Sequence, residues 1–260
     1  TLENLTVTFA GPRTSLFRKP SPYVALEDVT LTIRPGSIMG LVGESGSGKS
    51  TLAKAITGLV TPTYGTMILG DTVLPFGSSR SRHHPSRQLV QMVFQDPFAS
   101  LNPRVKVGQI IRQGPIIQGA TQDEAEARTL ELLKIVGLDE RAFNRYPHEF
   151  SGGQRQRIGI ARALALNPEI LVADEPVSAL DVSIQTQILS LLDEIRTKMN
   201  LSMVFITHDL RVAAQVCDRL AVMRYGEIVE TGATADIFDA PQHSYTRDLL
   251  AAVPGQNWER

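Results

Sequence analysis

The 260-residue chain carries 26 Lys and Arg against 27 Asp and Glu, and 42% of its residues are hydrophobic. The length allows a large buried core, and a formal charge of -1 gives no global attraction to nucleic acid or an anionic membrane. The single cysteine, Cys217, excludes an internal disulfide and an iron–sulfur cluster, and no apolar run is long enough for a membrane-spanning helix. The sequence therefore predicts a cytoplasmic globular protein.

The first third of the chain is rich in strands. Alternating or short apolar runs predict five of them, at residues 5–9, 23–33, 37–42, 66–69 and 88–94. The first two are expected to form an antiparallel hairpin. The third runs into a glycine-rich segment that is followed by a predicted helix over 49–56, which Gly58 ends. A polar loop is expected over 77–87.

The middle of the chain changes character after Pro103. Thr121 and Glu124 form a capping box ahead of an amphipathic helix over 125–136, and another helix begins after Ser151. The later part returns to strands at 170–173 and 202–207, which flank a predicted helix over 182–199. Strands that alternate with helices predict a parallel sheet with crossovers, here interrupted by a helical insertion at about 103–166.

The segment from Gly43 to Ser50 matches G-x-x-x-x-G-K-[ST] between a strand and a helix. Glycines let backbone N–H groups point at phosphate oxygens, and the helix N-terminus adds partial positive charge. Lys49 can then reach the outer phosphates, and the Ser50 hydroxyl can bind magnesium. The alternative, a plain turn with a solvated lysine, is disfavoured by this context.

Two carboxylates follow the apolar strand at 170–173. Asp174 and Glu175 stand at its carboxyl end, where ligands bind in open α/β sheets. Asp174 can hold magnesium, and Glu175 can polarise the water that attacks a γ-phosphate. A simple acidic turn is the alternative for an isolated pair, but together with the phosphate loop the pair predicts hydrolysis.

Ser151-Gly-Gly-Gln154 opens a helix as a capping box, and its two glycines expose backbone donors for a second anion. Taken in order, the phosphate loop, Gln95, Ser151–Arg155, Asp174–Glu175, residues 178–181 and His208 resemble the ATP-binding cassette (ABC) ATPases. Residues 95–104, 146–157 and 241–246 further resemble the ATPase subunits of dipeptide and oligopeptide importers, and nickel and glutathione importers share these segments.

The resemblance implies a set of roles. Catalysis would fall to Glu175, His208, Gln95 and Lys49, and magnesium to Ser50, Gln95 and Asp174. ATP would contact Phe9, Gly43, Glu44, Ser45, Gly46, Ser47, Gly48, Lys49, Ser50, Thr51, Gln95, Ser151, Gly152, Gly153, Gln154 and Asp181. Such cassettes dimerise head to tail, so the serine and glycines at 151–153 would face the γ-phosphate held by the other copy. Phe9 is the first choice for stacking on adenine, with Phe17 and Tyr23 as rivals.

Several of these residues also have a simpler interpretation. Gln95 can merely end a strand, Asp181 can cap the following helix, and the pair at 208–209 can do the same. His83 and His84 could suggest a metal, but without a third ligand a solvated loop is favoured. Cys217 is expected to be a packing residue.

Two positions depart from the family pattern. Phe150 replaces the commoner Leu, and Val177 replaces the usual Thr; both changes are expected to be mild. The chain begins with Thr and ends early compared with many dipeptide-type subunits, which is what one half of a fused tandem ATPase would show.

The resemblance implies an α/β fold: a P-loop NTPase core with a parallel sheet, an N-terminal antiparallel β subdomain and an inserted helical subdomain. The expected division is 1–102 with 167–260 for the RecA-like core plus the antiparallel β subdomain, and 103–166 for the helical subdomain. The expected function is ATP hydrolysis that drives uptake of peptides, glutathione or nickel.

The implied partners are a second ABC ATPase domain in a homodimer, heterodimer or fused tandem, transmembrane permease subunits and, indirectly, a periplasmic or extracellular solute-binding protein. No nucleic acid is expected, and the location would be peripheral, on the cytoplasmic face of the membrane. The alternative is a non-transport ABC ATPase that acts as a switch on the ribosome or DNA.

Overall fold

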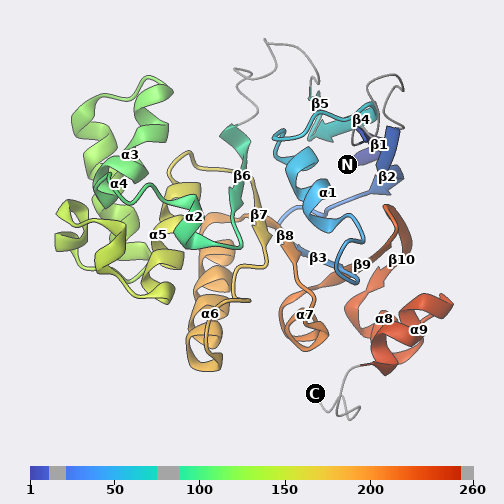
Figure 1. Ribbon diagram of the computed structural model, residues 1–260. Helices are drawn as coiled ribbons and strands as arrows, with labels where there is room; N and C mark the ends of the chain where they lie inside the picture. Colours follow the sequence, from blue (N-terminus) through green and yellow to red (C-terminus); the bar gives the residue numbers. More distant parts are fainter. Residues whose placement is uncertain (12–21, 75–87, 253–260) are drawn as a thin grey trace. The chain divides into compact units, whose positions relative to one another are not determined.

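The computed structural model describes residues 1–11, 22–74 and 88–252, and its contacts divide the chain into two compact units (Figure 1). Unit 1 contains residues 1–87 and 204–260, and unit 2 contains residues 88–203. Phe17, His83 and His84 lie outside the described residues. The expectations for these three residues therefore stay predictions.

Unit 1 contains an antiparallel sheet with the strand order β2-β1-β4-β5. Its strands are β1 (Leu2–Ala10), β2 (Pro22–Leu31), β4 (Tyr64–Leu69) and β5 (Thr72–Val73). The predicted hairpin is confirmed, since β1 and β2 pair antiparallel with Leu5 opposite Val29. Both side chains are buried, which fits the alternation read from the sequence. The short strand β5 was not predicted.

A second group of strands in unit 1 has the order β10-β9-β3-β8. It consists of β3 (Ile38–Val42), β9 (Arg219–Arg224), β10 (Glu227–Ala233) and β8 (Ser202–Ile206), whose last three residues belong to this unit. All five residues of β3 are buried and the strand runs parallel to β9, as expected for a strand covered on both faces. The sequence did not predict β9 and β10.

Four helices accompany these strands in the described part of unit 1. They are α1 (Lys49–Ile56), α7 (Leu210–Val216), α8 (Thr234–Asp239) and α9 (Ser244–Ala251). Cys217 ends α7 and packs against β3, because a Cβ on Gly40 would lie 2.7 Å from its sulfur. Burial raises the pKa of Cys217 to about 12, so the side chain is a neutral thiol. The predicted packing role of this cysteine is confirmed.

Unit 2 contains two strands and a set of helices. Strands β6 (Val90–Val93) and β7 (Ile170–Asp174) pair in parallel, as the crossover argument predicts. The helices are α2 (Pro97–Ser100), α3 (Val107–Ile117), α4 (Gln122–Ile135), the 3-10 turns η3 (Glu140–Asn144) and η4 (Pro147–Glu149), α5 (Gly152–Leu164) and α6 (Val182–Met199). The predicted capping box between Thr121 and Glu124 is confirmed at the start of α4.

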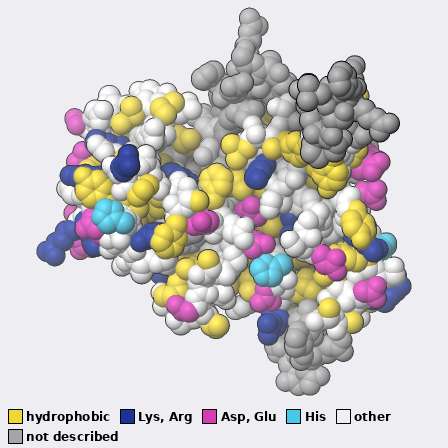
Figure 2. All heavy atoms as spheres, viewed as in Figure 1, with side chains coloured by type: hydrophobic (Ala, Val, Ile, Leu, Met, Phe, Trp, Pro, Cys, Tyr) yellow, Lys and Arg dark blue, Asp and Glu magenta, His cyan; other side chains and the backbone are white. Residues whose placement is uncertain are grey.

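On the face drawn in Figure 2, acidic and basic side chains of the described residues are interspersed. This fits the near-zero net charge of the chain. None of the described helices is both long and apolar enough to cross a membrane.

Candidate functional site

The glycine-rich loop of unit 1 connects the buried strand β3 to helix α1. Gly43 and Gly48 have φ angles of 148° and 109°, which side chains disfavour. A Cβ on Gly43 would lie 2.2 Å from the carbonyl oxygen of Met223. The loop is therefore a tight backbone turn packed against β9, and glycine is required for both conformation and space.

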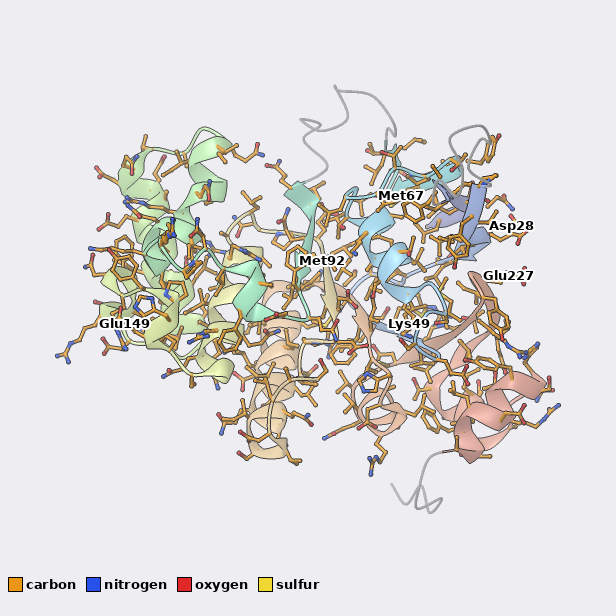
Figure 3. The ribbon with its side chains drawn as sticks, viewed as in Figure 1. Asp28, Lys49, Met67, Met92, Glu149 and Glu227 are labelled. Carbon is orange, nitrogen blue, oxygen red and sulfur yellow. The ribbon has the colours of Figure 1, made fainter. Side chains whose placement is uncertain are left out.

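Lys49 is the first residue of α1 and is only 6% exposed (Figure 3). Its ammonium nitrogen Nζ donates to the carbonyl oxygens of Gly43 and Glu44, both at 2.7 Å. No side chain caps α1, so its first N–H groups face the loop. A buried cation beside a helix N-terminus is suited to hold phosphate.

Two further contacts fix the loop within unit 1. The backbone N–H of Gly226, in the turn between β9 and β10, donates to the carbonyl of Ser47 at 2.8 Å. The backbone N–H of Glu44 donates to the hydroxyl of Tyr245 in α9 at 3.0 Å. The side chains of Ser45 and Ser50 are exposed, and Gly46 and Thr51 complete the predicted loop.

The other predicted site residues of unit 1 are Phe9 and His208. Phe9 is 41% exposed and lies opposite Tyr23, which is 61% exposed, on neighbouring strands. Cross-strand partners project to the same face, so both rings offer an open aromatic surface. His208 is exposed and follows Thr207, whose N–H donates to the carbonyl of Leu41 in β3. The choice between Phe9 and Tyr23 stays open.

Unit 2 brings Gln95 and Glu175 together. The Nε2 of Gln95 donates to the Oε2 of Glu175 at 2.9 Å, although 80 positions separate them. Glu175 has φ of 46°, a left-handed conformation uncommon for a residue other than glycine and frequent at functional sites. Asp174 is buried at the carboxyl end of β7. Its carboxylate and the Gln95 amide offer the oxygen atoms that magnesium prefers.

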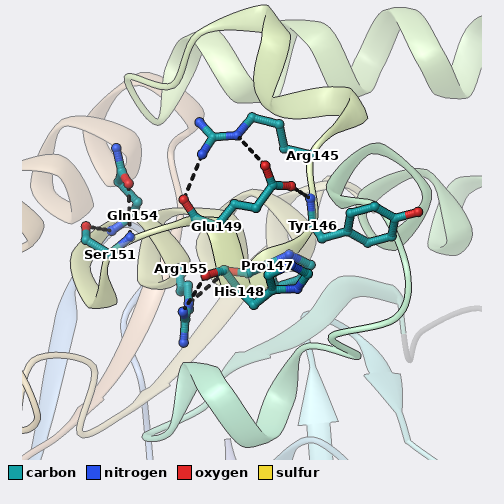
Figure 4. Close-up of polar contacts among 8 residues, drawn as sticks. All are labelled: Arg145, Tyr146, Pro147, His148, Glu149, Ser151, Gln154 and Arg155. Carbon is teal, nitrogen blue, oxygen red and sulfur yellow. Dashed lines mark hydrogen bonds and ion pairs between the residues drawn. The ribbon is translucent and has the colours of Figure 1, made fainter.

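Helix α5 of unit 2 begins with the predicted capping box (Figure 4). The N–H of Ser151 donates to Oε1 of Gln154 at 3.1 Å, and the N–H of Gln154 donates back to Oγ of Ser151. Arg155 ties the preceding segment to this helix, since its guanidinium donates to the carbonyls of Pro147 and His148. The serine and glycine backbone is thereby held at a defined helix start.

Glu149 closes the turn before this helix. Its Oε2 accepts from the N–H of Tyr146 at 2.6 Å, and Arg145 donates to its other oxygen. The Tyr146 N–H is the main cause that holds the pKa of Glu149 below its ordinary value, with Arg145 assisting. Arg145 also lies over the ring of Phe150, which is buried. Phe150, which stands where Leu is commoner in the family, is thus packed in the core of this unit.

Asp181 caps α6, as the simpler interpretation proposed. Its Oδ1 accepts from the N–H of Ile184 at 3.0 Å and from the Ser183 hydroxyl at 2.8 Å. The Ile184 N–H and the Ser183 hydroxyl lower the pKa of Asp181, so it stays charged. The capping role and the predicted nucleotide contact use the same carboxylate. The nucleotide contact stays a prediction.

Gly153 allows α5 to approach α6 closely. A Cβ on Gly153 would lie 2.5 Å from Cγ2 of Ile184. Gly153→Ala is therefore expected to lower the free energy of unfolding by about 1–3 kcal/mol, measured by denaturant titration, because the β-branched neighbour cannot move away freely. Gly159→Ala is the matched control on the same helix, since nothing lies within 4 Å of its added methyl. It should be neutral or stabilising.

The collision between the added methyl group and Ile184 can be tested directly. The double variant Gly153→Ala with Ile184→Ala removes the colliding methyl group, so it should lose less stability than the sum of the two single changes. Additive losses would show that the methyl contact is not the cause.

The contact of the Tyr245 hydroxyl with the glycine-rich loop was not predicted from the sequence. The segment 241–246 drew attention only through its resemblance to importer subunits. Nothing local in that segment indicates a partner 201 positions away.

Comparisons with known proteins identify a family for most of this chain, including the glycine-rich loop and the segment around Asp174. A family model described as ABC transporter matches residues 26–178. A putative peptide import ATP-binding protein of Brucella ovis is 48% identical over 230 residues, covering 88% of this chain and 72% of the relative. The oligopeptide transport ATP-binding protein OppF of Bacillus subtilis is 46% identical over 232 residues, covering 88% of this chain and 76% of the relative.

Solved structures that resemble the chain include an ATP-binding cassette and a component of an ABC transporter complex. A dimeric ATP-binding cassette in a post-hydrolysis state, bound to ADP and Pi, is 31% identical with a TM-score of 0.77. The alignment covers 90% of this chain and 97% of that one. The cbiO1 protein of Clostridium perfringens, part of a transporter complex, is 25% identical with a TM-score of 0.77 and covers 97% and 94% of the two chains.

Proposed function

The chain belongs to the ATP-binding cassette transporter family, and on this premise we propose that it is the ATP-hydrolysing subunit of an importer. The solute is a di- or oligopeptide or a related small molecule, because relatives at 46–48% identity are named as peptide, dipeptide and oligopeptide transport proteins. The observation that carries the ATPase function is the buried Lys49 at the glycine-rich helix start.

The residues of unit 1 supply the binding of ATP. The loop from Gly43 to Thr51 cradles the phosphates, and the charge of Lys49 offsets theirs. Phe9 stacks on adenine, with Tyr23 as the neighbouring alternative. His208 holds the γ-phosphate. The Ser50 hydroxyl fits magnesium, because Ser50 is an exposed residue in the first turn of α1 and its hydroxyl supplies an oxygen ligand.

The residues of unit 2 supply hydrolysis. Glu175 is the general base for the attacking water, and Gln95 orients its carboxylate. Asp174 is a carboxylate ligand suited to magnesium, which when bound offsets charge on the phosphates. We also infer that residues 103–166 act as a helical subdomain and that 1–102 with 167–260 act as the core.

A second ABC ATPase domain is the first partner. The dimeric state of the similar cassette supports a pair of such domains here. In that pair Ser151, Gly152, Gly153 and Gln154 contact the nucleotide of the other copy, and Asp181 contacts its phosphate loop. The three assemblies that remain are a homodimer, a heterodimer and a fused tandem.

Permease subunits are the second partner, and unit 2 offers a surface for them. An open hollow of about 520 Å³ lies along α3 and the segment before it, and its lining includes Asn102, Ile110 and Ile117. Ile117 is 72% exposed, so a docked partner would remove its apolar surface from water. A short apolar helix of a membrane partner fits this hollow. This role places the chain on the cytoplasmic face of the membrane.

Ile117→Glu tests this docking surface. We expect the variant to keep its ATPase rate in isolation but to lose ATP-sensitive co-purification with candidate permease subunits, because a charged carboxylate would replace an apolar contact with the docked helix and would have to lose its hydration. Val73→Glu changes an exposed apolar residue of unit 1 and serves as the control. Equal complex recovery for both variants would exclude the hollow as the docking site.

The function itself is tested by measuring Mg²⁺-dependent ATP hydrolysis by the purified chain and by its complex with the permease subunits. Stimulation by the membrane subunits supports transport. The alternative, a switch on the ribosome or DNA, predicts salt-sensitive binding to ribosomes or DNA instead. The names of the relatives do not favour that alternative.

A further inference from the structure

Tyr245 is a buried residue near the start of α9, far from the phosphate loop in sequence. It is 5% exposed, and its hydroxyl accepts the backbone N–H of Glu44 at 3.0 Å. Glu44 is the second residue of the loop. We propose that Tyr245 is a positioning residue that holds the phosphate loop in the conformation that receives nucleotide. This inference rests on the proposed ATPase function and names a residue that controls its binding site.

The position of Tyr245 is itself fixed by the turn before α9. The carboxylate of Glu230 in β10 accepts the N–H groups of Gln242 at 2.7 Å and His243 at 3.0 Å. The Nδ1 of His243 accepts the N–H of Tyr245 at 3.1 Å and so caps the helix. Arg247 donates to two carbonyls of the same turn. Each bond restricts the backbone that carries the tyrosine.

The ring of Tyr245 is held as well. The guanidinium carbon of Arg224 lies 4.7 Å from the centre of this ring and 5.0 Å from the centre of the Tyr225 ring. Arg224 ends β9, directly after Met223, whose carbonyl lies against Gly43. Strand β9 therefore contacts both the loop, through Met223, and the ring of Tyr245, through Arg224. The tyrosine hydroxyl has little freedom to leave Glu44.

The physical consequence is preorganisation. Three of the first six residues of the loop, Gly43, Gly46 and Gly48, are glycines, and glycine loses more conformational entropy than other residues when its backbone is ordered. Contacts that order the loop before nucleotide arrives remove part of this cost from binding. Tyr245 and Gly226 hold the loop at Glu44 and Ser47. Loss of the hydroxyl should therefore weaken nucleotide binding more than it changes the rate at saturation.

Tyr245→Phe tests the proposal because it removes only the hydroxyl and keeps the ring under Arg224. We expect the Kd for ADP and the KM for ATP to rise about 3- to 30-fold, with kcat within twofold of the parent chain. Tyr225→Phe is the matched control, since it removes a hydroxyl from the exposed ring beside the same arginine. Its Kd and KM should equal those of the parent.

A second measurement does not depend on nucleotide. Amide hydrogen exchange of the peptide that contains residues 43–47 should become faster in Tyr245→Phe and stay unchanged in Tyr225→Phe. Glu230→Gln, which cannot accept both turn N–H groups through oxygen, should shift ADP affinity in the same direction.

Parent-like ADP affinity and parent-like exchange in Tyr245→Phe would overturn the proposal, even if the variant unfolds at a lower temperature. Such a result would leave only a packing role for the ring. Failure of the proposed function gives a different result, because the parent chain itself would then bind no ADP and hydrolyse no ATP, and the proposal would fall with it. A change in affinity restricted to Tyr245→Phe and Glu230→Gln supports it.

Discussion

Glu175→Gln is expected to lower the rate of ATP hydrolysis about 10²–10⁴-fold while ATP binding is retained, because it removes the proposed general base and changes little else. The amide oxygen of the new side chain can still accept from Nε2 of Gln95, which now bonds Glu175 at 2.9 Å. The size of the side chain and the turn after β7 are preserved. The measurement is phosphate release under saturating Mg-ATP, together with ATP affinity by calorimetry.

Glu169→Gln provides the control for this experiment. Glu169 is exposed and immediately precedes β7, so the same acid-to-amide change is made at the opposite end of the strand. Its rate should stay within twofold of the parent. A Glu175→Gln variant that keeps more than a third of the parent rate would show that another group activates the water.

The Glu175→Gln variant also tests whether the second ATPase domain is another copy of this chain. Blocked hydrolysis should trap the ATP-bound pair of cassettes, seen as a doubling of mass by light scattering with ATP but not with ADP. A dimer would support two self-complementary sites in a homodimer. A chain that binds ATP but stays monomeric would require a different cassette, a fused half or the membrane subunits for closure.

Residues whose roles are local could be predicted from the sequence. The phosphate loop is defined within eight positions by glycines and a lysine, and the capping boxes at Thr121 and Ser151 by residues three positions apart. Each of these patterns encodes its own geometry, since the bonding partners are neighbours in the chain. The strand and helix before and after the loop follow from the same local signals.

Contacts between distant segments could not be predicted in this way. The Gln95–Glu175 bond spans 80 positions and the Tyr245–Glu44 bond spans 201. Both depend on which strands become neighbours and in which register, and short apolar runs do not specify this. Strand β9 was not predicted for a related reason. Its apolar run is short, has no clear period and is flanked by Arg219 and Arg224. Strand β10, which pairs with β9, was not predicted either.

Lys49→Met is expected to weaken the binding of ATP and ADP about 100-fold, measured by calorimetry, because it removes the buried ammonium and keeps most of the apolar stem. Charge-assisted hydrogen bonds contribute about 1.5–3 kcal/mol each, so the loss of two such bonds to phosphate accounts for a change of this size. The variant also removes the donor of two 2.7 Å bonds to the carbonyls of Gly43 and Glu44.

Lys54→Met is the matched control, because it lies on the exposed side of the same helix and carries the same charge. If the affinity depends only on the net positive charge of α1, the two variants will weaken binding equally, and the assignment of Lys49 to the phosphates fails. If it depends on a cation placed inside the loop, only Lys49→Met will lose affinity. Its thermal midpoint without nucleotide will then show how much the ammonium also contributes to the fold of the loop itself.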